Sequence, residues 1–536
     1  MSETNIPFQD PTHGAGLALP APPESYVRDK SAAIVIDTPS SILQKIFSFP
    51  AMLATFLVGA VFFVARDFTV DPDLWWHIKN GQNILATHHW PTTDQFSFTV
   101  AGQPWISTEW LGDVLFATVA RLGGLRGLDA LLIMLGSAVM LALYAYATLR
   151  SRNSKAGFVA ATVLFVLANP SFSLRPQMLG YLFLVLTLIV LERYRQGRPG
   201  ALWFLPFLFL LWVNTHGSFV IGMGAIGAYW LGGLANFRLG DLAAAAWTNS
   251  ERLRLEIVFL LCLVALTITP YGAELASYPF HVASSLPVGV ANVMEWQPMP
   301  FNLPGAKIFL ALLLGFPVIT MAFRPKWRIE EVALFLFGAM MACLHLRFLL
   351  VFVPFCTPLF ASVVARWVPG YERSKDRYLL NAILMTGVLV AMVRYFPTRP
   401  QLEAIVARGF PVNAVAYLRE HSVPGPLFNN YNFGGYVVSM NEKTFVDGRA
   451  DPYERGGVLA DYFHIARLQP GALTLLRNYG VRSCLLERNE PLATMLAVLP
   501  EWQRVYADDL SVLFVKRQND SPVGAAPGQS APGTKE

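Results

Sequence analysis

Long apolar runs alternate with short polar segments over most of the chain. A helix needs about 20 apolar residues to cross a bilayer core of about 30 Å, and most of the runs approach that length. The shorter runs are typical of helices that are broken or that border a water-filled cavity. The pattern predicts eleven spans, at 47–66, 127–149, 156–171, 178–194, 201–214, 218–236, 255–271, 306–323, 330–346, 348–366 and 379–396.

The amino-acid composition agrees with this pattern. Of the 536 residues, 54% are hydrophobic and 14% are charged, and the mean hydropathy is +0.43. A soluble domain needs more polar side chains to cover its surface, so we predict a mainly α-helical, polytopic membrane protein. The net charge of +5 is small for this length, and we expect no nucleic-acid partner.

Arginine and lysine residues lie mainly in alternate loops between the predicted spans. Cytoplasmic loops carry an excess of these cations, so their distribution gives the orientation. We therefore place the N-terminus in the cytoplasm of a bacterial cell, and the loop 67–126 and everything after about 397 outside its inner (plasma) membrane. The cation-rich loops contain Arg150, Arg152, Lys155, Arg193, Arg195, Arg198, Arg238, Arg252, Arg254, Arg324, Lys326, Arg328, Arg366, Arg373, Lys375 and Arg377.

The polar segments divide the chain into four predicted parts. We expect a disordered cytoplasmic N-terminus over 1–43, a transmembrane domain over 44–397, a small extracytoplasmic α/β domain over 400–518 and a disordered tail over 519–536. The tail is rich in Pro, Gly and Ser, a composition that cannot bury a core.

The segment 400–518 has the composition of a globular domain. Its stretch FPVNAVAYLREH has the spacing of an amphipathic helix, and VYADDLSVLFVKR that of a closing strand pair. We predict short strands with Gly-containing turns in GPLFNNYNFGGYVVSM and KTFVDGRADPY. The latter stretch brings Asp447, Arg449 and Asp451 near a turn, and we interpret them as a surface ion pair rather than as acceptor contacts.

Ionisable and aromatic residues gather at the outward ends of the predicted spans. Such groups cost roughly 2.5–3.5 kcal/mol each at the centre of a membrane helix, so their positions carry information. Because the loops that hold them face the same side, we expect one cavity at the outer interface that holds a charged ligand. Its candidate residues are Asp71, Asp73, Trp75, Trp76 and His77 after the first span, Glu109 in the same loop, and Arg175, His216, Glu295 and Arg347.

These residue types suit glycosyl transfer. A carboxylate of Asp71 or Asp73 can act as a base toward a sugar hydroxyl, and the pair is also a candidate ligand set for Mg²⁺ or Mn²⁺. Arginines bind phosphate with two parallel hydrogen bonds, and tryptophans offer flat faces to sugar rings. We predict transfer from a polyprenyl-phosphate-linked sugar, held with its tail in the membrane lipid, to a glycan, lipid or protein acceptor.

The stretches DPDLWWHIKNGQNIL, PTTDQFSFT and PWISTEWLGDVLF resemble a family of bacterial multi-spanning proteins in the GT-C glycosyltransferase superfamily. Relatives in that superfamily are protein O-mannosyltransferases, aminoarabinose transferases of lipid A and oligosaccharyltransferases. The resemblance covers the whole chain in layout and mainly 67–117 and 428–451 in motif. It implies that Asp71 or Asp73 is the catalytic carboxylate, with Glu109 as a secondary acid.

Three other functions are compatible with the same residues. A transporter or flippase of lipid-linked saccharides would need polar groups near the middle of the membrane. A polymerase or ligase of lipid-linked saccharides would depend on Arg175, His216 and Arg347 without an Asp base. A non-enzymatic scaffold would leave the cluster of acids and arginines without a purpose.

Overall fold

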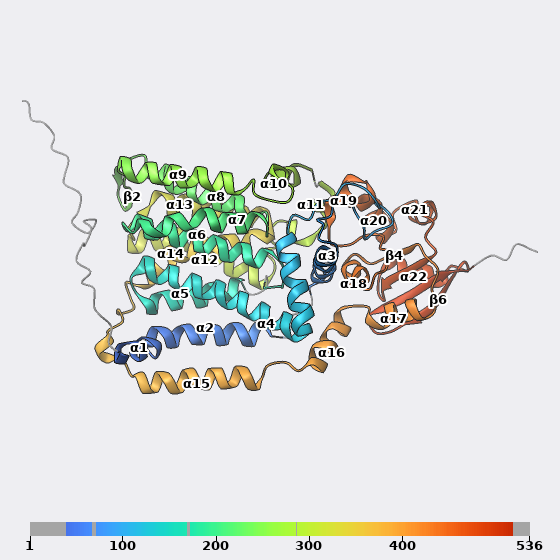
Figure 1. Cartoon of the computed structure of the whole chain (residues 1–536), viewed down its shortest axis with the longest axis horizontal. Helices are drawn as coiled ribbons and strands as arrows, with labels where there is room; N and C mark the ends of the chain where they lie inside the picture. Colours follow the sequence, from blue (N-terminus) through green and yellow to red (C-terminus); the bar gives the residue numbers. More distant parts are fainter. Residues whose placement is uncertain (1–38, 67–70, 169–171, 286, 518–536) are drawn as a thin grey trace, which may run out of the picture.

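The computed structural model describes residues 39–66, 71–168, 172–285 and 287–517 (Figure 1). The tail predicted over 519–536 lies outside the described residues. Of the predicted N-terminal segment 1–43, only residues 39–43 are described, and they belong to helix α1 (Pro39–Ile46) rather than to a disordered stretch. Proline is favoured at the first position of a helix, where its missing N–H has no partner to lose.

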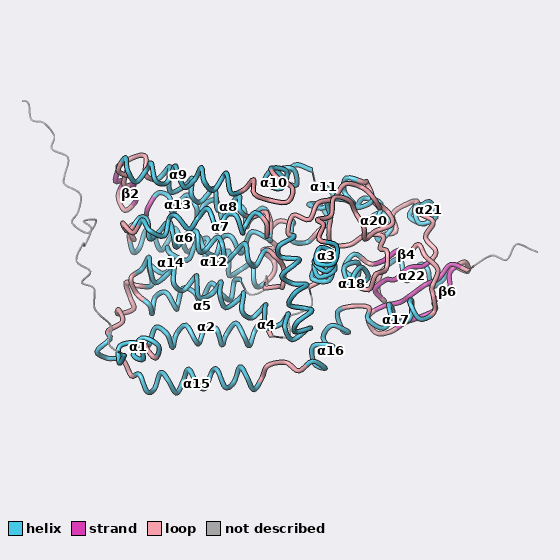
Figure 2. Tube along the Cα trace, in the orientation of Figure 1, coloured by secondary structure: helices cyan, strands magenta, loops and turns pink. Residues whose placement is uncertain are grey.

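Apolar helices run alongside one another and form a bundle (Figures 1 and 2). Each of the eleven predicted ranges falls on one of them. A helix satisfies the backbone hydrogen bonds of a long apolar run while its side chains are buried. The helices are α2 (Phe49–Ala65), the second part of α4 (Trp110–Ser151), α5 (Ser154–Ala168), α6 (Gln177–Arg195), η3 (Pro199–Phe204) with α7 (Leu205–Val213), α8 (Phe219–Gly232), α9 (Asn249–Ala265), α12 (Pro304–Phe323), α13 (Ile329–Leu344), α14 (Leu349–Val364) and α15 (Tyr378–Arg394).

Four helices in the described residues are long and apolar enough to cross a membrane, so the chain is a membrane protein. They are α4, α6, α12 and the stretch Leu346–Val364 that contains α14. Helix α15 and α16 (Arg399–Gly409) meet at 65° and add a fifth if the bent pair is one span. The remaining apolar helices are shorter, and the number of spans stays a prediction.

The helix α4 is bent, and its first part leaves the bundle. Gly124 inside it has φ 56° and ψ −148°, a conformation that glycine adopts without steric cost. The part before Gly124 packs against α3 (Leu74–Thr87), and a Cβ on Gly81 of α3 would lie 2.1 Å from the Asp113 carbonyl oxygen. The same end of the bundle carries α10 (Ala273–Ser285) and α11 (Pro287–Asn292), and η4 (Met294–Trp296) contacts both α11 and η5 (Leu346–Phe348).

The opposite end of the bundle carries short elements. Strands β1 (Phe237–Leu239), β2 (Leu242–Ala244) and β3 (Trp327–Arg328) form a sheet in the order β1-β2-β3. A 3-10 turn, η6 (Arg373–Lys375), precedes α15.

The C-terminal part contains a four-stranded sheet in the order β4-β5-β7-β6. Strand β4 (Leu427–Asn429) is parallel to β5 (Ser483–Glu487), and β7 (Ser511–Lys516) is antiparallel to both β5 and β6 (Trp502–Ala507). The surrounding helices are α17 (Val412–Glu420), η7 (Tyr431–Phe433), α18 (Gly434–Ser439), α19 (Ala450–Arg455), α20 (Val458–Ala466), α21 (Ala472–Asn478) and α22 (Pro491–Val498).

Two of the strand predictions in this part are wrong. Only the first residues of GPLFNNYNFGGYVVSM form a strand, β4, and the rest turns into η7 and α18. The stretch KTFVDGRADPY contributes one isolated bridge, between Thr444 and Ser97, and then the helix α19. Tertiary packing overrides the strand preference here, because Val437 and Val438 are buried on α18 rather than in a sheet.

The C-terminal part is joined closely to the segment that follows α3. The Phe98 N–H donates to the Thr444 carbonyl at 3.1 Å, and the Thr444 N–H donates to the Phe96 carbonyl at 3.2 Å. Helix α18 packs against α3, where a Cβ on Gly435 would lie 2.2 Å from the Pro72 carbonyl oxygen. One interface of backbone contacts therefore fixes the start of α3 against the C-terminal sheet.

The close approach at Gly435 gives a test of this interface. The substitution Gly435→Ala forces the methyl group against Pro72, and we expect a loss of about 1–3 kcal/mol, typical of overpacking. The control Gly227→Ala adds a methyl group at a helical site on α8 with no neighbour within 4 Å. Thermal unfolding should show a lower midpoint for Gly435→Ala than for the control, and equal midpoints would contradict the interface.

Candidate active site

The side chain of Arg175 joins three carboxylates from distant parts of the chain. Arg175 lies in the turn before α6, and its Nε donates to Asp71 Oδ2 at 2.6 Å. Its Nη2 lies 3.1 Å from Asp73 Oδ2, and its Nη1 donates to Glu295 Oε2 at 3.1 Å. The three N–H groups of one guanidinium therefore fix the start of α3 and the 3-10 turn η4 relative to α6.

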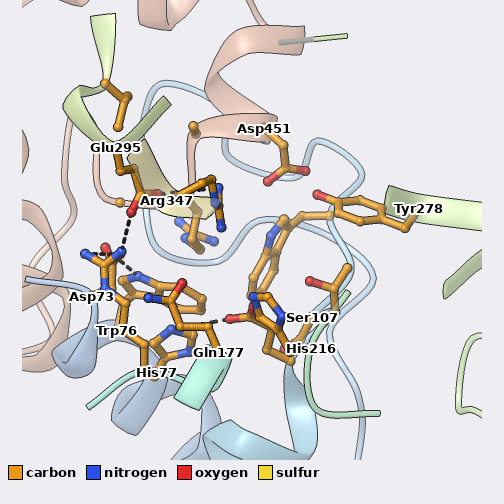
Figure 3. Close-up of a pocket in the computed structure, with 18 of the residues that line it drawn as sticks. Asp73, Trp76, His77, Ser107, Gln177, His216, Tyr278, Glu295, Arg347 and Asp451 are labelled. Atoms are coloured by element: carbon orange, nitrogen blue, oxygen red, sulfur yellow. Dashed lines mark hydrogen bonds and ion pairs between the residues drawn. The ribbon is translucent and has the colours of Figure 1, made fainter. Parts of the chain in front are cut away.

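A cavity of about 210 Å³ lies beside this cluster, between the end of the bundle and the C-terminal part (Figure 3). In Figure 3 Asp73, Trp76 and Arg347 lie on one side of it, and Tyr278 and Asp451 lie across from them. The predicted site residues that line the cavity are Asp73, Trp76, His77, Glu109, Arg175, His216, Glu295 and Arg347.

Two of the predicted site residues do not line this cavity. The Asp71 carboxylate is buried behind Arg175 and accepts the Asp73 N–H at 2.9 Å. The Trp75 ring packs against Phe410 and Tyr436, with ring centroids 5.3 and 5.2 Å away. Asp71, which precedes α3, thus positions Arg175 and Asp73. Trp75 lies in the first turn of α3 and packs against the C-terminal part, because that turn directs successive side chains to different faces.

Asp73 presents its carboxylate to the cavity under several constraints. Its Oδ1 accepts the Trp76 Nε1–H at 3.3 Å, while Arg175 holds Oδ2. A Cβ on Gly448 would lie 1.7 Å from Asp73 Oδ1, so only glycine fits in the turn that passes there. Burial raises the pKa of Asp73 against the opposing charge of Arg175.

Glu109 lies between two imidazole rings. Its Oε2 is 3.6 Å from His77 Nε2, and its Oε1 is 3.4 Å from His216 Nε2. Burial raises the pKa of Glu109 to about 7, with the charge of His77 opposing the shift. This carboxyl can therefore exchange a proton near neutral pH.

The two histidines are held in different states. Burial opposes protonation of His77, but Asp113, 2.5 Å from its Nδ1, together with Glu109 and Asp73 outweighs burial and raises the pKa of His77. Burial, together with the charges of Arg347 and His77, lowers the pKa of His216 to about 3. The Ser218 N–H donates to His216 Nδ1 at 3.1 Å, so neutral His216 carries its proton on Nε2, toward Glu109.

Arg347 forms a longer ion pair than Arg175 does beside the Asp73 carboxylate. It comes from η5, and its Nη1 lies 3.5 Å from Glu295 Oε1. Its guanidinium carbon lies 4.1 Å from the centre of the Trp296 ring, which leaves N–H groups at the edge of the stack. Arg347 can therefore exchange its one long ion pair, with Glu295, for a contact with an incoming anion.

The interpretation of Arg449 as part of a surface ion pair is wrong. Its guanidinium is buried, with Nη2 2.7 Å from Asp447 Oδ2 and 2.8 Å from Asp94 Oδ1, and it lines the cavity. Its Nη1 has no hydrogen-bond partner in the described part of the chain. The sequence signal for this position was Gly448, since a glycine between an acid and an arginine indicates a close backbone approach.

The cavity also includes residues that the sequence did not single out. Tyr278 on α10, Gln177 at the start of α6 and Ser107 in the loop before α4 all line it. Their types are common in loops and helices, so no pattern distinguished them before the chain was folded.

The candidate metal ligands Asp71 and Asp73 both contact Arg175. The guanidinium lies between the two carboxylates and supplies the positive charge that a divalent cation would supply. This arrangement leaves no place for a divalent cation between them. Among the described residues, no group of three or more His, Cys, Asp and Glu side chains is placed to hold a metal ion.

No protein-family model and no curated protein matches the chain. Solved structures do show similarity. An oligosaccharyltransferase from Archaeoglobus fulgidus, tethered to an acceptor peptide, is 12% identical, with a TM-score of 0.49 over 83% of this chain and 70% of its own. ArnT from Cupriavidus metallidurans, bound to undecaprenyl phosphate, is 15% identical, with a TM-score of 0.47 over 87% of this chain and 98% of its own.

A third similar structure is the arabinofuranosyltransferase AftD from Mycobacteria. It is 14% identical, with a TM-score of 0.48 over 87% of this chain and 41% of its own. Because the scores lie below 0.5, we base the function on the residues of the site and not on the likeness.

The raised pKa of Glu109 can be measured directly. We expect a protonated carboxyl band in the infrared spectrum that disappears as the pH rises through about 7 and that is missing from Glu109→Gln. Burial also raises the pKa of Glu490, in the C-terminal part, to about 7, so its band should remain in Glu109→Gln and vanish in Glu490→Gln. An unchanged spectrum in Glu109→Gln would show that Glu109 is ionised throughout.

Proposed function

We propose that the chain is an integral membrane glycosyltransferase that moves a sugar from a polyprenyl-phosphate donor to an acceptor outside the cytoplasm. The observation that carries this proposal is one cavity, at the end of an apolar bundle, into which a carboxylate and two guanidiniums point together: Asp73, Arg175 and Arg347. A donor with a lipid tail can keep the tail beside the bundle while its phosphate reaches this end.

The proposed reaction needs one base and one cation. The Asp73 carboxylate removes the proton from the acceptor hydroxyl as that oxygen forms its bond to the anomeric carbon of the sugar. The bond between that carbon and the phosphate oxygen breaks, and the electron pair leaves with the phosphate. Arg347 stabilises the charge that develops on the phosphate, while Arg175, held by three carboxylates, positions Asp73.

Glu295 occupies the place of an anion between the two arginines. It contacts Arg175 with one oxygen and Arg347 with the other, and its side chain is 32% exposed, against 18% for Asp73. The donor phosphate replaces Glu295 at Arg347, because the most exposed carboxylate of the cluster loses the least on release into water.

The orientation and the span count belong to the same proposal. The positive-inside distribution supports eleven spans, a cytoplasmic N-terminus and an extracytoplasmic C-terminal part in a bacterial inner membrane. Placing the cavity outside is consistent with this, since it lies at the end of the bundle away from most loop cations.

A polymerase or ligase of lipid-linked saccharides is the second candidate. His216, Arg175 and Arg347 line the same cavity and could act on a lipid-linked saccharide without an Asp base. The two functions differ in their dependence on Asp73.

Replacement of the proposed base gives the main test. In proteoliposomes with a polyprenyl-phosphate sugar, we expect Asp73→Asn to lower kcat by about 10²–10⁴-fold, the usual effect of a general base. Asp71→Asn should keep measurable transfer, with a lower unfolding midpoint, because Asp71 supports Arg175 from behind. Full activity of Asp73→Asn, together with loss of activity in Arg347→Gln, would favour the polymerase or ligase.

The competition between Glu295 and phosphate predicts opposite effects of two substitutions. Arg347→Gln should weaken binding of polyprenyl phosphate about ten- to a hundredfold, as expected when a hydrogen bond to a charged group is lost. Glu295→Gln should tighten it about fivefold, which corresponds to about 1 kcal/mol for a partly exposed ion pair. Binding is measured by calorimetry in detergent, with Arg467→Gln on α20's C-terminal side as the control for a lost surface cation. Equal affinities for Glu295→Gln and the unmodified protein would contradict the competition.

A further inference from the structure

A second cavity, of about 530 Å³, lies at the other end of the bundle. It is lined by the start of α2, the ends of α4 and α6, and Ser154 at the start of α5. Helix α6 connects the two sites, since Gln177 at its start lines the first cavity and Arg193 near its end lines the second. With a rise of 1.5 Å per residue, these two positions are about 24 Å apart.

Two cations at the second cavity have no anionic partner. Arg152 and Arg193 line it with exposed side chains, and neither guanidinium forms an ion pair or hydrogen bond within the described part of the chain. Three acidic side chains at this end have other partners. Glu192 pairs with Arg328 at 2.6 Å, Glu331 pairs with Arg150, and Asp376 accepts hydrogen bonds from Tyr371 and Asn381.

Two hydroxyl groups, of Thr148 and Ser154, line the same cavity. The hydroxyl oxygens of Thr148 and Ser154 lie near the Tyr144 phenol, but neither has a hydrogen bond of ordinary geometry in the described residues. Ser154 is 93% buried, at 7% exposure. Hydroxyl groups can donate to oxygen atoms, so their place beside two unpaired arginines favours a ligand with oxygen atoms.

The rest of the lining is apolar. Ala145 and Leu149 on α4 and Ile189 on α6 form an apolar wall, in which Ala145 is exposed and the other two are partly exposed. A free phosphate would satisfy the arginines but not this wall, whereas a lipid satisfies both, with its headgroup at the arginines and an acyl chain along the helices.

We infer that the second cavity is a binding site for an anionic phospholipid, whose phosphate is held by Arg152 and Arg193 and whose acyl chain lies against Ala145 and Ile189. The surrounding loops are rich in arginine and lysine, which attract the anionic lipids of the cytoplasmic leaflet. The site is independent of the transfer reaction, because it shares no residue with the first cavity.

Native mass spectrometry of the full-length protein in detergent tests this site. Phosphatidylglycerol is titrated, with phosphatidylcholine and inorganic phosphate as alternative ligands. We expect saturable binding of phosphatidylglycerol, with at least tenfold weaker binding of phosphatidylcholine and no displacement by inorganic phosphate. Displacement of phosphatidylglycerol by inorganic phosphate, or equal binding of phosphatidylcholine, would overturn the assignment to an anionic phospholipid.

Substitutions separate the cavity from general surface charge. The double variant Arg152→Gln with Arg193→Gln should bind phosphatidylglycerol at least tenfold more weakly, and Ala145→Trp, which fills the apolar wall without changing charge, should do the same. Arg198→Gln removes an exposed cation from the same end outside the cavity and should change affinity less than twofold. Unfolding midpoints measured without lipid verify that each variant is folded. Equal binding by the double variant, or equal loss in Arg198→Gln, would overturn the proposal.

Discussion

The guanidinium of Arg175 is the constraint on which the candidate site depends. The Arg175 side chain is only 22% exposed, and a charge that has lost most of its hydration is stabilised by partners of opposite charge. Arg175 therefore requires Asp71, Asp73 and Glu295 at hydrogen-bonding or ion-pair distance, although their positions span more than 200 residues of sequence. Satisfying this one cation brings α3, α6 and η4 together, and the cavity is the space that remains beside them.

A second buried arginine connects the C-terminal part to the same cavity. Arg449 binds Asp447 of its own segment and Asp94 of the segment between α3 and α4, and its guanidinium carbon lies 4.5 Å from the centre of the Trp105 ring. The glycine before it, Gly448, lets the backbone approach Asp73. The C-terminal part thus supplies one wall of the site, and a displacement of that part would also change the surroundings of Asp73.

The sequence predicted the helices and the membership of the cavity better than its internal geometry. Long apolar runs identify helices because hydrophobic burial and backbone hydrogen bonding favour the same segments. The convergence of Asp73, His216, Glu295 and Arg347 followed from loop topology alone. The directions of Asp71 and Trp75 could not be predicted, since they depend on the first turn of α3 and on its contact with α18.

The wrong predictions in the C-terminal part also result from contacts with segments that are distant in the sequence. The sequence YVVS favours a strand by its β-branched residues, but its place against α3 makes it the helix α18. The burial of Arg449 was also not predicted, because an arginine between two acids resembles an ordinary surface ion pair. Its further partner, Asp94, lies about 350 positions earlier in the sequence. Long-range partners decide such cases, and a single sequence does not contain them.

The different exposure of the three carboxylates around Arg175 explains why we assign them different functions. The exposed fractions of the side chains rise from 5% for Asp71 to 18% for Asp73 and 32% for Glu295, although all three contact Arg175. Asp71 is too buried to exchange partners, so it acts as a fixed counter-ion. Glu295 can return to water at small cost, which suits a group that an incoming anion replaces. Asp73 lies between these limits, held by Arg175 and Trp76 yet facing the cavity, and such a carboxylate can take a proton without leaving its place.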